Sequence, residues 1–272
     1  MLTGVACATS ASGEKPSPAV TKHDPGSVAK VPPGSTTDCA DCWRPNLDES
    51  WQIQLTGKVD PSVKADVYEI DLFDSSAGLV QTLHDLGRKV VCYIDAGTWE
   101  NWRPDAADFA QSVRGGSNGW PGERWLDIRQ LGLLSPILQA RLDLCRAKGF
   151  DGVDFDNVDG YTNHTGFPIT YADQLSFNRF LAGQAHNRHL SVGLKNDPEQ
   201  VLDLLPDFDW ATVEECFQFQ ECASYRPFVE AGKPVIAIEY TLQPEEFCQQ
   251  AQSLRFKAMR KRRNLDAFRT SC

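Results

Sequence analysis

The stretch Gly149-Phe-Asp-Gly-Val-Asp-Phe-Asp-Asn-Val-Asp-Gly-Tyr161 decides how the rest of the chain is interpreted. Its centre alternates apolar and acidic residues, which is the pattern of a β-strand with one apolar and one polar face. Asp154 and Asp156 then point to the same side, one above the other, with Asp156 nearer the carboxyl end. We therefore expect a strand over residues 152–156 that carries two carboxylates on its inner face.

Similar strand patterns recur on both sides of this stretch and alternate with helical segments. The expected strands cover residues 51–55, 67–72, 89–94, 152–156, 190–194, 210–214, 234–239 and 265–268. The clearest amphipathic helices cover residues 137–148, 172–187 and 244–262, the last with basic residues at its C-terminal end. No glycine-rich nucleotide turn follows the first strand, which argues against a doubly wound open sheet. The pattern predicts an α/β fold, namely a single (β/α)8 TIM barrel with helices after the strands.

The start of the chain has a different composition. Residues 8–38 contain five prolines among Ser, Thr, Lys and Gly, which is typical of a flexible tether. We expect residues 1–42 to be an N-terminal leader and tether, and residues 43–272 to be the folded catalytic domain. Residues 1–7 are apolar and lack a basic segment. They are either the remnant of a secretory or lipoprotein signal, in which Cys7 would carry a lipid, or an arbitrary start.

The charge balance excludes some classes of partner. The 272 residues carry 27 Lys and Arg against 37 Asp and Glu, which is a formal charge of -10. This charge repels a phosphate backbone, so nucleic-acid binding is not expected, and it attracts cationic ligands. No stretch approaches the roughly 18 to 20 consecutive apolar residues of a membrane-spanning helix. We expect a monomer without a membrane span.

Nine cysteines are many for a cytosolic enzyme, and eight remain when Cys7 is set aside. An oxidising compartment, and so a secreted or cell-surface protein, is favoured. Cys39-x-x-Cys42 fits a disulfide better than half of a zinc site or a redox motif, because no second such pair or spaced His pair accompanies it. Cys216 and Cys222 are close enough to bridge a short loop. The pairing of the other cysteines stays open.

Polar side chains gather where the expected strands end. They are Asp71, Asp95, Asp154, Asp156, Asn157, Lys195, Asn196, Glu214, Glu239 and Tyr240. A single acidic residue at a strand end is commonly a helix N-cap, but these six carboxylates from five strands converge on the mouth where barrel enzymes carry their active sites. Two neighbouring carboxylates raise a pKa unless a cation or donor offsets them, and Lys195 or Asn196 on the next strand could do so.

Three aspartates within six positions, ending at Asp159, would also suit Mg²⁺ or Ca²⁺. The spacing is not that of an EF-hand, and no histidine falls at ligand spacing. We expect neither a metal nor a cofactor. A metal-dependent lyase or aldolase remains an alternative hypothesis, and a carbohydrate-binding barrel without catalytic activity is another.

Four tryptophans lie in the long third connection, between Asp95 and the helix expected from residue 137. They are Trp99, Trp102, Trp120 and Trp125. Aromatic faces stack on sugar rings and on cationic groups, so this connection could form a platform beside the mouth. The other interpretation is a loop that packs on a small core of its own.

Several longer motifs resemble one enzyme family. They are Trp51-Gln-Ile-Gln-Leu, Tyr68-Glu-Ile-Asp-Leu-Phe-Asp74, Val91-Cys-Tyr-Ile-Asp-Ala-Gly97, the run ending at Tyr161, Val192-Gly-Leu-Lys-Asn-Asp197 and Glu214-Glu-Cys-Phe-Gln-Phe-Gln-Glu-Cys222. In this order they resemble glycoside hydrolase family 114, the endo-α-1,4-polygalactosaminidases, over residues 43–272. The resemblance implies a TIM-barrel enzyme that cuts α-1,4-linked galactosamine polymers inside the chain.

The resemblance also implies two catalytic residues, Asp156 at the end of strand four and Glu214 at the end of strand six. By analogy with other barrel glycosidases, Asp156 is the nucleophile and Glu214 the general acid/base. Glu215 has the opposite side-chain parity, and alignment to Cys216 favours Glu214. Two facing carboxylates are what glycoside hydrolysis requires, and an acidic mouth suits a cationic amino-sugar polysaccharide. The expected substrate-binding residues are Asp71, Tyr93, Asp95, Trp102, Asp154, Asn157, Lys195, Asn196, Glu239 and Tyr240.

Overall fold

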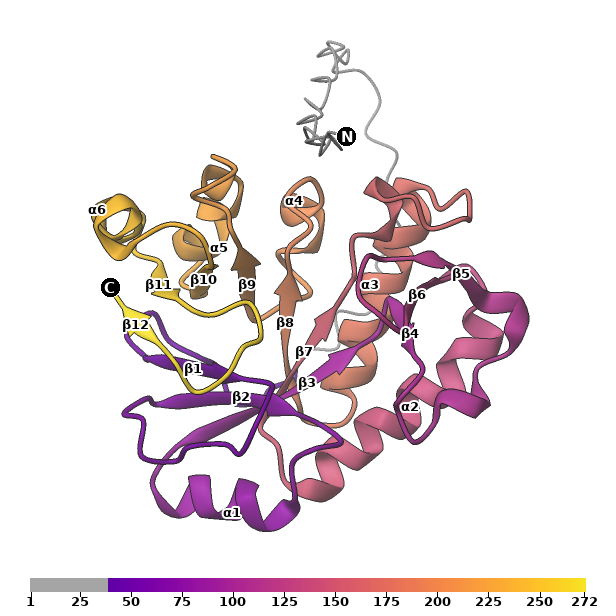
Figure 1. Ribbon diagram of the computed structural model, residues 1–272, viewed down its shortest axis with the longest axis horizontal. Coiled ribbons are helices and arrows are strands. Elements are labelled where there is room, and N and C mark those ends of the chain that lie inside the picture. The colour runs from indigo at the N-terminus through magenta and orange to yellow at the C-terminus, as the bar shows by residue number, and fades with distance from the viewer. Residues whose placement is uncertain (1–38) are drawn as a thin grey trace, which may run out of the picture. The chain divides into compact units, whose positions relative to one another are not determined.

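The computed structural model describes residues 39–272, so Cys7 and most of the predicted leader and tether lie outside the described residues. Eight parallel strands form one curled sheet in which spatial order follows sequence order (Figure 1). They are β1 (Trp51–Gln54), β2 (Val67–Asp71), β3 (Lys89–Asp95), β7 (Gly152–Asp156), β8 (Ser191–Lys195), β9 (Trp210–Glu214), β10 (Val235–Glu239) and β11 (Lys257–Arg260). A ninth strand, β12 (Thr270–Ser271), pairs antiparallel with β11.

The first seven predicted strands are confirmed to within one residue at each end. The eighth, predicted over residues 265–268, is wrong, because the chain forms β11 inside the segment predicted as a helix up to residue 262. Helix α6 (Pro244–Leu254) ends at Arg255, which adopts a left-handed φ of 60°. Phe256 then enters the core, and β11 pairs with β10. The basic residues that indicated a helix C-terminus belong to this strand and the segment after it.

Helices pack on the outer face of the sheet (Figure 1). Besides α6 they are α1 (Ala77–Asp85), α2 (Leu131–Lys148), α3 (Tyr171–His186), α4 (Val201–Leu204) and α5 (Arg226–Glu230), with the 3₁₀ turns η1 (Ala106–Asp108), η2 (Gln111–Val113), η3 (Gly160–Thr162) and η4 (Cys222–Tyr225). Thr170 and Asp173 form a capping box at the start of α3. The first connection, residues 55–66, contains no helix, so the expected helix after every strand is wrong there. Within residues 39–272 no helix is both long and apolar enough to cross a bilayer.

Apolar side chains form two cores, one between the sheet and the helices and one inside the curl. The inner core joins Trp51 of β1 to Trp210 of β9 and Met259 of β11. The rings of Trp51 and Trp210 lie 5.5 Å apart, centroid to centroid. This packing fills the inside of the curl, so the polar residues of the inner face lie toward the carboxyl ends of the strands.

The segment after β11 forms hydrogen bonds with the region of the first strand. The ladders of the described residues include none between β1 and β11. Instead the backbone N–H of Leu55 donates to the carbonyl of Leu265 at 2.8 Å, and the guanidinium of Arg269 donates to the carbonyl of Trp51. The number, direction and order of the parallel strands are those predicted, and the segment after β11 makes these contacts with the first strand and the residue that follows it.

The long third connection builds a small antiparallel sheet of its own. It contains β4 (Thr98–Glu100), β6 (Glu123–Leu126) and β5 (Arg114–Ser117), in the order β4-β6-β5. The backbone N–H of Leu126 donates to the carbonyl of Gly97 at 2.9 Å, which ties this sheet to the end of β3. The side chains of the small sheet are thereby brought to the carboxyl end of the main sheet.

Four disulfides use all eight cysteines of the described residues. The pairs are Cys39–Cys42, Cys92–Cys145, Cys216–Cys222 and Cys248–Cys272. The third confirms the bridge expected from sequence spacing, and the first confirms that Cys39 and Cys42 form a disulfide, although the sequence left their partners open. Cys92–Cys145 fastens β3 to α2 across 53 positions of sequence, which is the longest loop that any of the four closes.

Loss of Cys92–Cys145 should destabilise the fold most. A bridge closing a loop of that length stabilises by about 4 kcal/mol in the chain-entropy account, so Cys92→Ala/Cys145→Ala should lower Tm by roughly 10 °C. Cys39→Ala/Cys42→Ala, which opens a loop of three positions, is the matched control and should lower Tm much less. Calorimetry on both double variants checks this, and equal losses would contradict it.

Candidate active site

The carboxyl ends of the parallel strands surround a cavity of about 570 Å³. Nine of the twelve predicted site residues line it, namely Asp71, Tyr93, Trp102, Asp156, Asn157, Lys195, Asn196, Glu214 and Tyr240. This is the edge of the sheet at which parallel strands bring their C-terminal residues together. Asp95, Asp154 and Glu239 are buried and do not line the cavity.

Lys195, at the end of β8, joins the two predicted catalytic carboxylates, and we call Asp156, Lys195 and Glu214 the central triad. The Nζ atom of Lys195 lies 2.9 Å from Oδ1 of Asp156 and 3.1 Å from Oε2 of Glu214. These two oxygens are therefore at most 6.0 Å apart, the sum of the two distances. Burial alone would lower the pKa of Lys195, but the two carboxylates hold that pKa well above its ordinary value. The lysine is a cation between them.

Asp156 is held as a carboxylate. Burial would raise its pKa, but the charge of Lys195 and the hydrogen bonds from Lys195, Tyr93 and Asn157 outweigh burial, so the pKa lies below its ordinary value. The hydroxyl of Tyr93 donates to Oδ2 at 2.7 Å, and the backbone N–H of Asn157 donates to Oδ1 at 2.9 Å. Both oxygens are thus fixed in position, which suits a nucleophile.

Glu214 is oriented by Asn196 and Tyr240. The backbone N–H of Glu214 donates to Oδ1 of Asn196 at 2.9 Å, and the amide of Asn196 donates back to Oε2 of Glu214 at 3.3 Å. The hydroxyl of Tyr240 donates to the other carboxylate oxygen, Oε1. The side chain of Glu214 remains 26% exposed, so it reaches the cavity while its direction is set.

The residue after each member of the central triad has a left-handed backbone. Asn157, Asn196 and Glu215 have φ values of 59°, 52° and 54°. This conformation costs a non-glycine residue about 1 to 3 kcal/mol and occurs mainly where surrounding structure imposes it. Here it ends each strand abruptly, so that consecutive side chains from β7, β8 and β9 can all reach the same region.

Glu214 and Glu215 have different partners. Glu215 makes an ion pair with Arg263, whose Nη2 lies 3.1 and 3.2 Å from its two oxygens. Both glutamates line the cavity, but Glu214 is the one that contacts Lys195. The geometry therefore favours Glu214 as the partner of Asp156.

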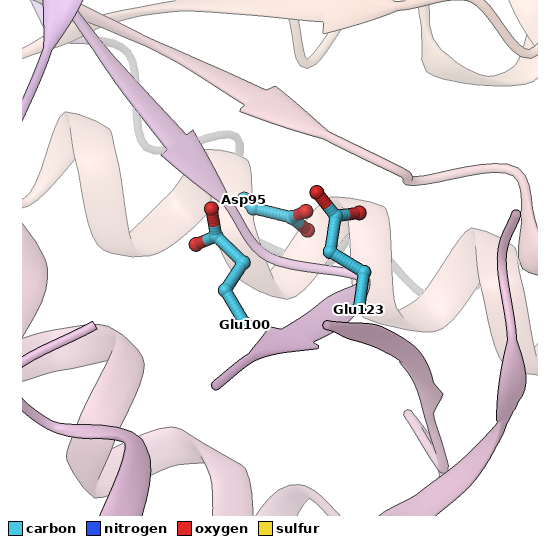
Figure 2. A group of neighbouring side chains, drawn as sticks. All are labelled: Asp95, Glu100 and Glu123. Carbon is cyan, nitrogen blue, oxygen red and sulfur yellow. The ribbon is translucent and has the colours of Figure 1, made fainter. Parts of the chain in front are cut away.

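Three further carboxylates meet at one wall of the site. Asp95, Glu100 and Glu123 offer oxygens that all lie within 4.8 Å of one another, and Figure 2 shows the three side chains converging. Burial is the largest cause that raises the pKa of each. Asp95 accepts from the backbone N–H of Thr98 at 2.8 Å, and Glu100 pairs with Arg103 at 2.6 Å. Such a group can hold a cation, either a metal ion or an ammonium group.

Tryptophans of the third connection serve two structural purposes. Trp102, Trp120 and Trp125 line the cavity, and the first two are 52% and 53% exposed. Trp99 instead packs inside the connection, where the guanidinium of Arg114 lies 4.3 Å from its ring centroid. The connection has a small packed interior and also presents aromatic faces to the cavity.

Besides Asp95, two predicted substrate contacts lie deeper than expected. Asp154 sits one pleat below Asp156 and is 1% exposed. Glu239 accepts from the backbone N–H of Phe217 at 2.9 Å and so holds the loop that follows Glu214. Burial raises the pKa of each to about 7. A role in binding substrate stays a prediction for both, because neither side chain reaches the cavity wall in this structure.

Sequence reasoning missed the charged residues of the third connection. Arg103 pairs with Asp71 at 2.7 Å and with Glu100 at 2.6 Å, and its side chain is 7% exposed. Glu123 approaches the same wall from β6. The sequence feature that could have indicated site residues here is the run Glu100-Asn-Trp-Arg103, in which charged residues lie on both sides of a tryptophan. Nothing in its spacing indicates that it folds back over the mouth.

Comparison with known proteins now identifies the chain. Residues 33–272 match glycoside-hydrolase family GH114. The chain belongs to this family. It is therefore a glycosidase, and the resemblance found from the motifs is confirmed.

Solved relatives agree with this fold. Ega3 of Aspergillus fumigatus, solved in complex with galactosamine, is 40% identical with a TM-score of 0.81, covering 85% of this chain and 97% of that chain. The glycoside hydrolase domain of PelA from Pseudomonas aeruginosa is 15% identical with a TM-score of 0.64, covering 82% of this chain and 98% of that domain, and shares the fold.

A sequence relative is also found in a bacterium. An uncharacterised protein of Deinococcus radiodurans is 26% identical over 72% of this chain and 73% of its own length.

Replacing Lys195 by Met should disable the site. The change removes the charge that offsets the burial of Asp156, so the pKa of Asp156 should rise and turnover should fall by about 100-fold or more. Carboxyl NMR titration and turnover measurements check this. Arg263→Met, which breaks the ion pair of Glu215, is the control and should leave the Asp156 titration in place. An unchanged Asp156 titration in Lys195→Met would contradict the assignment.

Proposed function

We propose that this glycosidase cleaves internal α-1,4 linkages of galactosamine polymers, such as polygalactosamine or galactosaminogalactan. The observation that carries the proposal is the central triad, in which one lysine holds two carboxylates within 6.0 Å at the floor of an acidic cavity. The galactosamine bound to Ega3, which is 40% identical, supports the choice of sugar. A carbohydrate-binding barrel would not need two carboxylates so placed.

In the first chemical step, Asp156 attacks the anomeric carbon while Glu214 gives its proton to the departing glycosidic oxygen. The low pKa of Asp156 keeps it ionised and ready to attack. In the second step, Glu214 takes a proton from water, which displaces Asp156 from the sugar. Lys195, Tyr93 and Tyr240 donate hydrogen bonds to these two carboxyl groups and thereby set their directions.

The spacing of the carboxylates favours retention of configuration. Retaining glycosidases place the two carboxyl groups about 5 to 5.5 Å apart, whereas inverting enzymes need about 6.5 to 9.5 Å to admit a water. The triad limits the nearest oxygens of Asp156 and Glu214 to 6.0 Å through Lys195. This spacing supports a covalent glycosyl intermediate on Asp156.

The acidic wall supports a cationic substrate. Asp95, Glu100 and Glu123 converge beside the cavity, and Trp102 and Trp120 expose their rings at its rim. Carboxylates attract the ammonium groups of deacetylated amino sugars, and aromatic faces stack on sugar rings. An N-acetylated chain loses the first of these attractions.

We also propose that the enzyme is an extracellular monomer whose sheet closes as a barrel through residues 261–269, with residues 1–42 as leader and tether. Four disulfides are typical of oxidising compartments, which supports the location. The hydrogen bonds from Leu55 and Arg269 across the sheet edges support the closure.

Substrate charge should decide the rate. The enzyme should release oligomers from deacetylated polygalactosamine, and full N-acetylation should reduce kcat/KM by about 100-fold or more because the ammonium attraction is lost. Glu123→Gln should raise KM for the deacetylated polymer, with Glu230→Gln on the exposed face of α5 as the matched control. Product analysis by mass spectrometry checks both. Equal rates on both polymers would overturn the choice of substrate, and loss of activity with EDTA would favour the metal-dependent alternative.

The two catalytic carboxylates should differ in their response to the leaving group. Glu214→Gln removes the proton donor and should slow polymer cleavage by about 100- to 10,000-fold, while an activated aryl glycoside should still form the glycosyl intermediate. Asp156→Asn should be inactive on both substrates. Burst kinetics and NMR of the first anomer released check this, with Glu215→Gln as the control. Reversed behaviour would exchange the roles, and an inverted product would exclude the covalent step.

A further inference from the structure

Two carboxyl groups lie buried beneath the central triad without an evident role. Glu69, in the middle of β2, is 3% exposed, and Asp154 of β7 is 1% exposed. Within residues 39–272, Oε2 of Glu69 and both oxygens of Asp154 have no hydrogen-bond partner. The hydroxyl of Thr212 is near enough to lower the pKa of Asp154, but the geometry falls short of a hydrogen bond. A buried carboxyl left without partners is costly as a charge and far less so as a neutral acid.

The neighbouring strand, β8, leaves space for the carboxyl group of Asp154. Gly193 on β8 lies opposite Asp154 in the ladder. A Cβ atom at Gly193 would lie 2.7 Å from Oδ1 of Asp154 and 2.4 Å from Nε1 of Trp210. Lys195 lies two residues further along β8, on the same side of the strand. The absent side chain of Gly193 therefore makes room for the Asp154 carboxyl directly below the lysine.

Charge counting shows why this layer matters to the triad. Lys195 shares this interior with four carboxyl groups: Glu69, Asp154, Asp156 and Glu214. Lys261, just after β11, also acts on Glu69 and donates to the carbonyl of Asp266 at 2.7 Å. Burial lowers the pKa of Lys261 to about 8, so this lysine is charged at pH 6 and loses most of its charge by pH 9. If all four carboxyl groups were ionised, the attraction of the Lys195 ammonium group would be shared among four negative charges. A proton bound by Glu69 or Asp154, the two deeper groups, reduces that competition for Lys195.

We infer that Glu69 is a positioning residue for the catalytic pair: it keeps a proton through the neutral range and so leaves the ammonium group of Lys195 to Asp156 and Glu214. The inference deepens the proposed function and rests on it. Burial, and then the charge of Asp154, raises the pKa of Glu69 well above its ordinary value, which supports the assignment. Asp154, with a pKa of about 7, ionises first.

The inference predicts an effect of alkaline pH. When Glu69 finally ionises, the new negative charge attracts Lys195 from below and repels Asp156 and Glu214. Both changes loosen the contacts of Lys195 with the catalytic pair, so activity falls. A glutamine at position 69 imitates the neutral acid in shape and polarity but cannot ionise.

The activity test compares Glu69→Gln with wild type across pH. At pH 6 the variant should keep roughly a third or more of wild-type kcat/KM, and the ratio of variant to wild type should rise by at least about threefold between pH 6 and pH 9. A purely structural role would lower the variant by the same factor at every pH. A flat ratio would therefore overturn the inference.

Two measurements do not need substrate, so they distinguish failure of this inference from failure of the proposed function. In carboxyl NMR of the wild type, the Asp156 signal should shift once near pH 7, when Asp154 ionises, and again at higher pH, when Glu69 titrates. Only this second shift should be absent in Glu69→Gln. An acid that is neutral when folded but ionised when unfolded costs stability increasingly as pH rises above about 4.3. The Tm advantage of Glu69→Gln should therefore grow between pH 5 and pH 8.

Glu239→Gln is the matched control. Glu239 is likewise fully buried with a raised pKa, but its pKa responds to burial, to Phe217 and Gln218, and to Glu215, with no contribution from Lys195. Its Tm should show a similar pH response while the alkaline shift of the Asp156 signal stays as in wild type. If Glu69→Gln does not fold, the wild-type titration decides alone, and a flat Asp156 signal above neutral pH overturns the inference.

Discussion

The ammonium group of Lys195, whose side chain is 7% exposed, contacts Asp156 and Glu214 at 2.9 and 3.1 Å, and the side chains of these two carboxylates are 21% and 26% exposed. Withdrawing the three charges from much of their water costs free energy, so the arrangement persists only where good geometry and further hydrogen bonds offset that cost. The two tyrosine hydroxyls supply such bonds. The left-handed residues that end β7, β8 and β9 supply the geometry. The local backbone is strained because the chemistry requires three charged side chains to meet.

The pKa values of the carboxyl groups in this interior are higher for the groups that lie deeper below the cavity floor. At the cavity floor, Lys195 keeps Asp156 ionised, whereas Asp154, one pleat lower, has a pKa of about 7. Glu69 lies in the same buried layer with a pKa well above its ordinary range. The same residue type therefore serves as a charge or as a neutral acid according to its distance from solvent and from one lysine. Beneath this layer, the packed rings of Trp51 and Trp210 exclude water.

Strand periodicity accounts for what the sequence predicts well. Seven strands follow from alternation. Eight of the twelve residues predicted for the site line the cavity because parallel strands meet at their carboxyl ends, and a ninth, Trp102, lines it from the third connection. The eighth strand was missed because its basic residues also suit the end of a helix, and Arg255 alone marks the break. Glu100, Arg103 and Glu123 were missed because they reach the site through a hairpin-like connection. Its path depends on tertiary contacts such as the ion pair between Arg103 and Asp71.

The missing helix after β1 has a consequence for folding. The outer side of this first strand contacts the far end of the chain, since the Gln52 amide donates to the carbonyl of Ala267 at 3.1 Å, 215 positions away. The carbonyl of Trp51 likewise accepts a hydrogen bond from the guanidinium of Arg269. Contacts of such high sequence separation form late and slow the folding of parallel sheets. During synthesis, β1 therefore keeps an unsatisfied edge until nearly the whole domain has emerged, and this is the interval in which aggregation through that edge is most dangerous.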